Sequence, residues 1–87
     1  SLAALRLARE ALARIVPFDT ETIEVALRGL AEELGVKVGP LFGILRGAIS
    51  AQKVSPPLFE SIEILGRDES LARIDAAIEV LSARAEE

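Results

Sequence analysis

The side chains that could do chemistry are few in this chain, and they are not those of an enzyme. The 87 residues include no His and no Cys, so the commonest general base, a thiol nucleophile and a thiolate metal site are all excluded. No Gly-rich loop ends in the Lys-Ser/Thr of a phosphate site. Neighbouring carboxylates such as Glu32 and Glu33 point in different directions on a helix and indicate solvated surface. We therefore expect no catalytic residue and no metal site, and we expect binding to be the function.

Binding is suggested first by a stretch without acidic residues. The chain has 14 Asp and Glu against 10 Lys and Arg, for a net charge of −4. Residues 34–59 nevertheless carry only Lys37, Arg46 and Lys53 as charged side chains. Such a segment can hold an anionic partner without repelling it. Arg46 has no acid three or four residues away, so it reaches into water, pairs across the fold or binds a ligand.

The elements that must position these residues are helices. Apolar residues recur at helical spacing, and no segment alternates as a strand does. The predicted helices cover residues 1–16, 20–34, 41–50, 56–65 and 69–82. The sequence therefore predicts an all-α fold, a compact bundle or cage of about five short helices that forms one domain over residues 1–87.

Three of these helices have recognisable end signals. Asp19 is suited to cap the start of the second helix and Gly35 its end. Asp68 is predicted to cap the start of the last helix. In the fourth helix Ser55 is the predicted N-cap, with Pro56 at the favoured first position. That helix start presents free N–H groups and a partial positive charge, which suit phosphate or carbonyl oxygens.

Two further features have an ordinary structural explanation. Gly43 and Gly47 lie four apart in the third helix, and close packing of a neighbouring helix is the simpler reason for them. Arg28 follows Glu24 by four residues, the spacing of a surface ion pair that contributes little to stability.

Four motifs carry a resemblance to a known family. They are LRGLAEELGVKVG (27–39), LRGAIS (45–50), VSPPLFE (54–60) and LGRDESLARI (65–74). With them, the run from Phe18 to Leu81 resembles the C-terminal anticodon-binding domain of bacterial glutamyl-tRNA synthetase, a class I aminoacyl-tRNA synthetase. The resemblance implies a helical cage around the anticodon loop of glutamate tRNA. Residues 18–82 would be the family-like core, residues 1–16 the leading helix, and the whole a C-terminal fragment of a longer ligase.

The resemblance also implies roles for individual residues. Arg46 would read anticodon bases and Arg28 would assist it. The residues that would line the base pockets are Ser55, Pro56, Leu58 and Phe59. Lys37 and Lys53 are further candidates for contacts with the phosphate backbone. These residue types suit the task, because Arg offers a planar fork of donors and Phe packs against unstacked bases.

The same resemblance sets what this chain can and cannot do. With no His and only two Lys, it lacks the family's ATP-binding signatures, so it would bind tRNA without aminoacylating it. The parent would be a cytoplasmic, ATP-dependent glutamate–tRNA ligase that uses ATP and Mg²⁺, with no cofactor in this fragment. The expected partners are the glutamate tRNA anticodon loop and the rest of the synthetase, and neither DNA nor a membrane. No apolar run approaches the ~20 residues that cross a bilayer.

Two other functions stay open at this point. One is a helical protein–protein interaction domain without RNA binding, in which Arg46 and Phe59 would be buried structure. The other is a very small enzyme, which would need activity without His or Cys. The positions of Arg46 and Arg28 in the folded chain distinguish the first alternative from RNA recognition.

Overall fold

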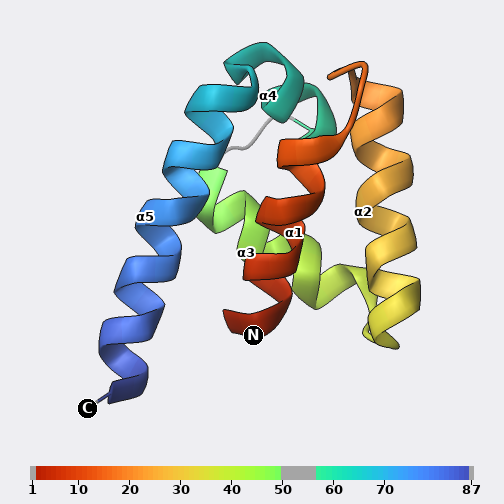
Figure 1. Cartoon of the computed structure of the whole chain (residues 1–87). Coiled ribbons are helices and arrows are strands. Elements are labelled where there is room, and N and C mark those ends of the chain that lie inside the picture. Colours follow the sequence, from red (N-terminus) through yellow and green to blue (C-terminus); the bar gives the residue numbers. More distant parts are fainter. Residues whose placement is uncertain (1, 50–56, 87) are drawn as a thin grey trace.

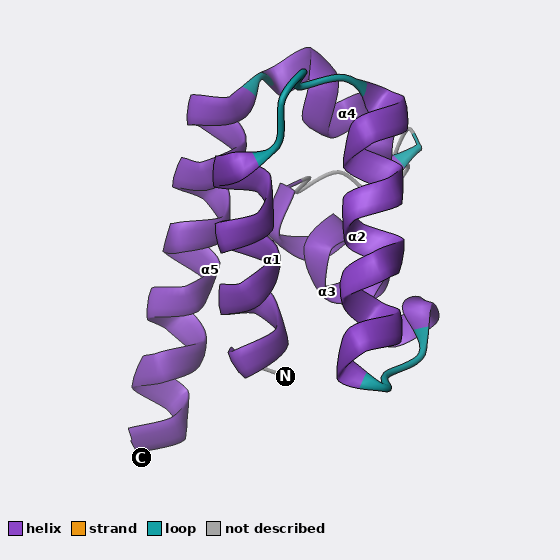
Figure 2. Ribbon diagram, turned by 45° about the vertical axis from the view of Figure 1, so that its right-hand side comes forward, coloured by secondary structure: helices purple, strands orange, loops and turns teal. Residues whose placement is uncertain are grey.

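The fold consists of helices joined by short connections. The computed structural model describes residues 2–49 and 57–86, and within these ranges it contains helices and no strand (Figure 2). The helices are α1 (Leu2–Arg14), α2 (Thr20–Leu34), α3 (Val38–Ile49), α4 (Leu58–Leu65) and α5 (Arg67–Glu86). The predicted all-α fold with about five helices is confirmed.

The helices pack in a simple order around α1. In Figure 1, α1 runs between α2 and α5, and it is in contact with both. The third helix, α3, crosses behind α1 and packs mainly on α5. The short α4 closes the upper end of the bundle, where it contacts α2 and α5. Residues 37–49 and the start of α4 are thereby brought beside α2.

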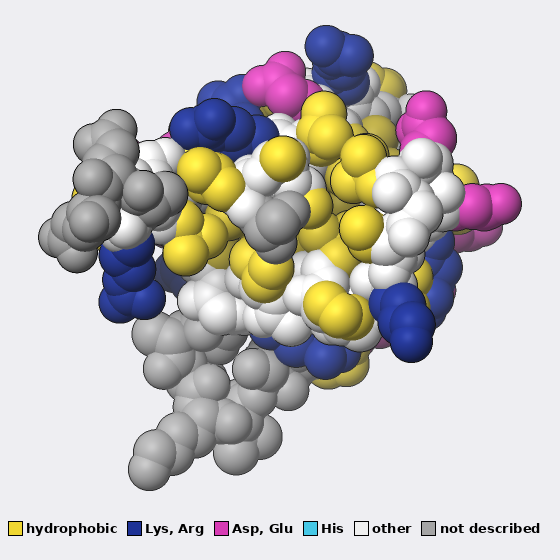
Figure 3. All heavy atoms as spheres, turned by 90° about the horizontal axis from the view of Figure 1, so that it is seen from below, with side chains coloured by type: hydrophobic (Ala, Val, Ile, Leu, Met, Phe, Trp, Pro, Cys, Tyr) yellow, Lys and Arg dark blue, Asp and Glu magenta, His cyan; other side chains and the backbone are white. Residues whose placement is uncertain are grey.

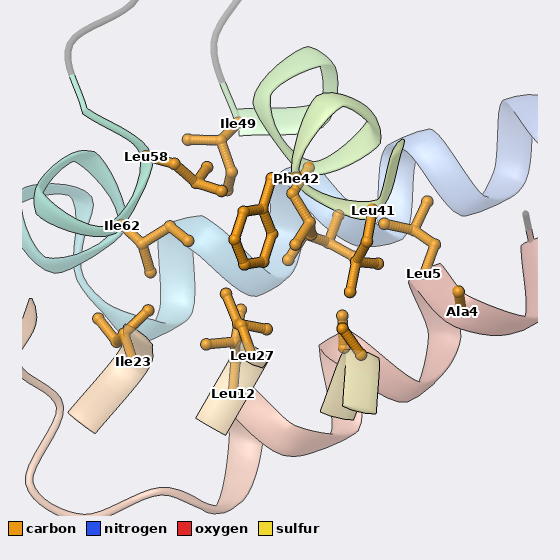
Figure 4. Packing of buried hydrophobic residues seen from close by; sticks show 14 residues of the cluster. Ala4, Leu5, Leu12, Ile23, Leu27, Leu41, Phe42, Ile49, Leu58 and Ile62 are labelled. Carbon is orange, nitrogen blue, oxygen red and sulfur yellow. The ribbon is translucent and has the colours of Figure 1, made fainter. Parts of the chain in front are cut away.

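The core is built from the apolar stripes that the sequence predicts. Side chains from α1, α2, α3 and α4 converge on one interior (Figure 4), and Ile74 adds the contribution of α5. The largest side chains that are fully buried are Leu5, Leu12, Ile23, Leu27, Leu45, Ile49, Ile62 and Ile74. Each such burial stabilises the fold by roughly 1.5–3 kcal/mol relative to an exposed side chain. Ser70 is the one buried polar residue described, and its hydroxyl donates to the Ile62 carbonyl at 3.2 Å.

Both predicted caps of α2 are present. The Asp19 carboxylate accepts a hydrogen bond from the Thr22 backbone N–H at 2.8 Å. At the other end Gly35 adopts the left-handed conformation, with φ of 67°, and its N–H points to the Ala31 and Glu32 carbonyls. Only Gly adopts this conformation without a steric penalty, so α2 ends where the sequence predicts.

The Asp19 cap makes the stability of the fold sensitive to acid. The hydrogen bonds from Thr22 lower the pKa of Asp19 from its usual 3.8. A carboxyl with a lowered pKa in the folded state contributes stability above its unfolded pKa and loses it as the pH falls through the folded value. We expect Asp19→Asn, which keeps a capping oxygen but does not titrate, to be less stable than the native chain near neutral pH. That difference should shrink below pH 3.8, as measured by urea unfolding at a series of pH values. A difference that stays constant down to the acid limit would contradict this role.

The starts of the other helices differ from the predictions. α3 begins at Val38 and not at Leu41, because Pro40 fits within a first turn, where no intrahelical N–H bond is needed. The prediction that Asp68 is an N-cap is wrong. The helix α5 already begins at Arg67, and the Ser70 N–H donates to the Gly66 carbonyl at 3.1 Å. Asp68 instead lies in the first turn, where its charge still suits the helix dipole.

The start of α4 is also later than predicted. The helix begins at Leu58, with Pro57 in the capping position and no side-chain capping bond. The predicted cap Ser55 and first residue Pro56 lie outside the described residues.

Two arginines of α5 bind the carboxyl ends of other helices. The Arg67 guanidinium donates to the carbonyls of Leu12 and Ile15, each at 2.8 Å, and lies 4.8 Å from the centre of the Phe18 ring. Leu12 lies in the last turn of α1 and Ile15 directly follows the helix, which has no glycine cap. Arg73 donates in the same way to the Ile49 carbonyl at the end of α3. A single helix therefore satisfies the last carbonyls of two others.

Candidate nucleic-acid interface

One arginine and two aromatic rings from three different helices form the most distinctive surface feature. The Arg28 guanidinium carbon lies 5.5 Å from the centre of the Phe42 ring and 5.8 Å from that of Phe59. The two rings meet edge to face, with 5.2 Å between their centres. We call this group the Arg28 cluster. It joins α2, α3 and the first turn of α4.

The Arg28 cluster holds the guanidinium in place while leaving donors available. Glu24, one turn earlier on α2, accepts from Arg28 Nε at 2.8 Å, which confirms the predicted pair. No hydrogen bond joins the Nη groups of Arg28 to another described residue, and the side chain is 52% exposed. A guanidinium that rests on aromatic faces and is fixed at Nε loses little further freedom when its outer N–H groups bind a ligand. This arrangement suits a planar, oxygen-bearing partner.

Arg46 lies on the same side of α3 as Phe42. It follows Phe42 by four residues, so the two side chains are neighbours along the helix. Arg46 is exposed, and within residues 2–49 and 57–86 it has no ion pair. Its place in the last turn of α3 is favourable for a cation, which is its ordinary structural explanation. The exposure contradicts the interaction-domain alternative in the form we considered, which required a buried Arg46.

The glycines of α3 are open at the surface. A Cβ atom built on Gly39, Gly43 or Gly47 would meet no atom of the described residues within 4 Å. The expectation that Gly43 and Gly47 allow a neighbouring helix to pack closely is therefore wrong. Gly39 and Gly43 lie on one side of Arg46, about 20° and about 60° from it around the helix axis at 100° per residue. The backbone beside Arg46 is consequently accessible.

The other predicted site residues are placed differently from one another. Phe59 is half-buried within the Arg28 cluster, whereas Leu58 is only 3% exposed and belongs to the core. Lys37 is exposed in the connection between α2 and α3. Ser55, Pro56 and Lys53 lie outside the described residues, so their roles stay predictions.

Sequence reasoning missed Phe42 as a site residue. Phe42 is one of many apolar residues in its helix, and it is only 7% exposed. Its ring nevertheless supports Arg28 from below. The signal available in the sequence was the spacing of four between Phe42 and Arg46, which places an aromatic ring and a free cation on one stripe.

Clusters of metal-ligating side chains and membrane-spanning helices were both sought among the described residues. Within residues 2–49 and 57–86, no group of three or more His, Cys, Asp or Glu side chains is arranged to hold one. No helix in these ranges is long and apolar enough to span a bilayer.

Comparison of the sequence with those of known proteins identifies relatives of this chain. A glutamate–tRNA ligase of Roseiflexus castenholzii is 47% identical over 83 residues, which are 95% of this chain and 16% of that ligase. A glutamate–tRNA ligase of Dehalococcoides mccartyi is 48% identical over 82 residues, 94% of this chain and 17% of the relative. The chain thus spans about a sixth of the length of these relatives.

A solved structure shows the same fold. The crystal structure of a glutamate tRNA ligase from Elizabethkingia meningosepticum in complex with its amino acid matches with a TM-score of 0.84 and 27% identity. The match covers 90% of this chain and 15% of that protein. The family described as the anticodon binding domain matches residues 1–78, and the chain belongs to this family.

Proposed function

We propose that this chain recognises the anticodon loop of glutamate tRNA, as the C-terminal part of a glutamate–tRNA ligase. The observation that carries the proposal is the Arg28 cluster with the exposed Arg46 one turn further along α3. Arg46 belongs to a segment without acids in an otherwise acidic chain, and Arg28 packs on two rings of that segment. The ligase relatives and the family support the same function.

The physical chemistry of single-stranded RNA explains why these groups suit it. Unstacked bases bind to aromatic rings and guanidinium planes, and their edges accept hydrogen bonds from fixed donors. In our proposal Arg46 donates to the edges of anticodon bases, and Arg28, which packs on the two rings, assists it. Phe59, which is half-buried, offers its remaining exposed surface to a base. The backbone at Gly43 can be approached closely because no side chain covers it.

Catalysis is assigned to the remainder of the ligase. In our proposal ATP and Mg²⁺ act there, because this chain, with no His and only two Lys, lacks the ATP-binding signatures that the resemblance implies for the ligase. This chain contributes affinity and the choice of tRNA. Interactions with a non-reacting part of a substrate can be used in this way to select it.

A titration with RNA tests the proposal. The anticodon stem–loop of glutamate tRNA is added to the chain, and a stem–loop with the same stem and a scrambled loop serves as the control. We expect tighter binding of the native loop, and an affinity that falls linearly on a log–log plot with salt at a slope of roughly −0.7 per phosphate contact. Equal affinity for both loops, or no binding at low salt, would contradict the proposal and leave protein–protein binding as the better function.

The open position at Gly43 gives a prediction with two opposite readouts. Gly43→Ala should stabilise the isolated chain by roughly 0.5–1 kcal/mol, because Gly is unfavourable inside a helix and a Cβ atom meets nothing there. The same methyl group should weaken binding of the stem–loop by blocking approach to the backbone. Thermal unfolding and RNA titration measure the two effects.

Gly29→Ala is the matched control, since Gly29 is equally open in the interior of α2. A Gly43→Ala chain that is more stable and binds RNA as well as before would contradict close approach at this position.

A further inference from the structure

The molecule has a second surface that the proposed RNA site does not use. It is an apolar groove of about 550 Å³ between the start of α1, the middle of α3 and the second half of α5. Its lining includes Leu2, Ile44, Ala48, Ala77, Val80 and Leu81, and no charged or polar side chain. We call it the apolar groove.

The apolar groove faces away from the proposed RNA site. Ile44 and Ala48 lie two residues before and after Arg46, and residues two positions apart on a helix are separated by about 160° around its axis. Gly47, which also lines the groove, directly follows Arg46 and is about 100° from it around the axis. The groove is therefore centred on the flank of α3 opposite Arg46, and only Gly47 lies between the two surfaces.

The groove belongs to an apolar face of the folded chain. Seen from below, apolar side chains gather in the middle of this face and charged side chains lie around its edge (Figure 3). Val80, which lines the groove, is 53% exposed. An apolar patch with a charged rim is typical of a surface that another part of a protein covers.

The position of the chain ends indicates what covers the apolar groove. The first turn of α1 and the last turns of α5 lie at the same lower end of the molecule (Figure 1), and both contribute to the groove lining. Leu2 itself lines the groove, so a segment that leads into α1 would approach beside it. The relatives are about six times longer than this chain, which covers 16% of the ligase from R. castenholzii.

We infer that the apolar groove is the docking surface for the remainder of the ligase, and that its occupant is the segment that leads into Leu2. The inference rests on the chain being part of a longer ligase and is independent of RNA binding. Docking there would fix the orientation of this domain, so that the RNA site on the other flank of α3 faces outward.

Hydrogen exchange compares the isolated chain with the full ligase, both without RNA. In the ligase, we expect the backbone amides of the α5 segment that includes Ala77 and Val80 to exchange on the order of ten-fold more slowly than in the isolated chain. Val80→Glu in the ligase should return this segment to the exchange rate of the isolated chain. The charge cannot enter an apolar interface without a large desolvation penalty.

Val25→Glu provides the matched control. Val25 is 68% exposed on α2 and does not line the groove, so the same substitution there should leave exchange of the α5 segment slow in the ligase. Neither substitution should unfold the isolated chain, because both side chains are already exposed. Thermal unfolding of the isolated variants checks this point.

Three results would overturn the inference. The first is the same exchange rate for the α5 segment in the ligase and in the isolated chain. The second is slow exchange in the ligase that survives Val80→Glu. The third is protection that appears in the isolated chain as its concentration is raised, since the occupant would then be a second copy. The RNA titration is read separately, so its failure would not affect this result.

Discussion

Arg67→Ala is expected to lower the free energy of unfolding by about 3 kcal/mol, because two hydrogen bonds from a charged donor are lost at once. The guanidinium bonds the carbonyl of Leu12 in the last turn of α1 and that of Ile15, which follows the helix, and both bonds are partly buried. Alanine would leave these carbonyls without their partner and uncover the Phe18 ring. In a domain of this size the change corresponds to a fall in the melting temperature of roughly 12–24 °C.

Arg84→Ala is the matched control for this experiment. Arg84 is an exposed arginine near the other end of α5, so its removal should change the melting temperature little. Arg67→Lys should fall between the two, since an ammonium group keeps the charge without the planar fork that reaches both carbonyls. If Arg67→Ala unfolds at the same temperature as Arg84→Ala, the end of α1 does not depend on this contact.

Arg46→Ala is expected to weaken binding of the glutamate tRNA anticodon stem–loop by about ten-fold or more. A well-placed arginine contact with a base edge contributes about 1–3 kcal/mol, and 1.4 kcal/mol is a factor of ten. The folded chain should be little affected, because Arg46 is exposed and has no ion pair among the described residues. Fluorescence anisotropy of a labelled stem–loop measures the affinity, and thermal unfolding confirms the fold.

Arg14→Ala separates a specific role of Arg46 from the loss of one positive charge. The Arg14 side chain is 81% exposed at the end of α1, and its contact with Glu10 is 3.9 Å long. Both variants change the net charge by the same amount, so a purely electrostatic effect would weaken both alike. Equal affinities of the Arg46 and Arg14 variants would exclude Arg46 from base recognition. A larger effect for Arg46 that disappears with the scrambled loop would support it.

The parts of the fold that the sequence predicts well are those set by neighbouring residues. The helix α2 begins and ends at the predicted residues, because Asp19 and Gly35 act within one turn of themselves. The apolar stripes of α1 and α2 are buried as expected, since helical spacing alone places Leu5 and Leu12, or Ile23 and Leu27, on one face.

The parts that could not be predicted depend on residues far apart in the chain. Arg67 caps α1 across more than fifty positions, and nothing in its local sequence distinguishes it from a surface arginine. Glu63, on α4, accepts hydrogen bonds from the Thr20 N–H and, at 2.7 Å, from its hydroxyl at the start of α2. Such partners follow from how the helices pack, which periodicity does not specify.

Part of the candidate site could likewise be predicted from the sequence, and part of it could not. Arg46 was selected from the sequence because no acid is close to it along the chain, and in the fold it is exposed and has no ion pair among the described residues. Arg28 was predicted to pair with Glu24, and this ion pair forms. Its contacts with the Phe42 and Phe59 rings could not be predicted, because they require three helices to meet. The apolar groove likewise involves α1, α3 and α5 and has no signature in any one of them.

The most direct test of the account is to map where the anticodon stem–loop binds on the isotope-labelled chain by nuclear magnetic resonance. We predict that the shifts change most at Arg28, Gly43, Arg46 and Phe59, that those of Val80 in the apolar groove stay unchanged, and that the scrambled loop produces much smaller changes. Changes centred on the apolar groove, or the same changes with the scrambled loop, would contradict recognition of the anticodon by this surface.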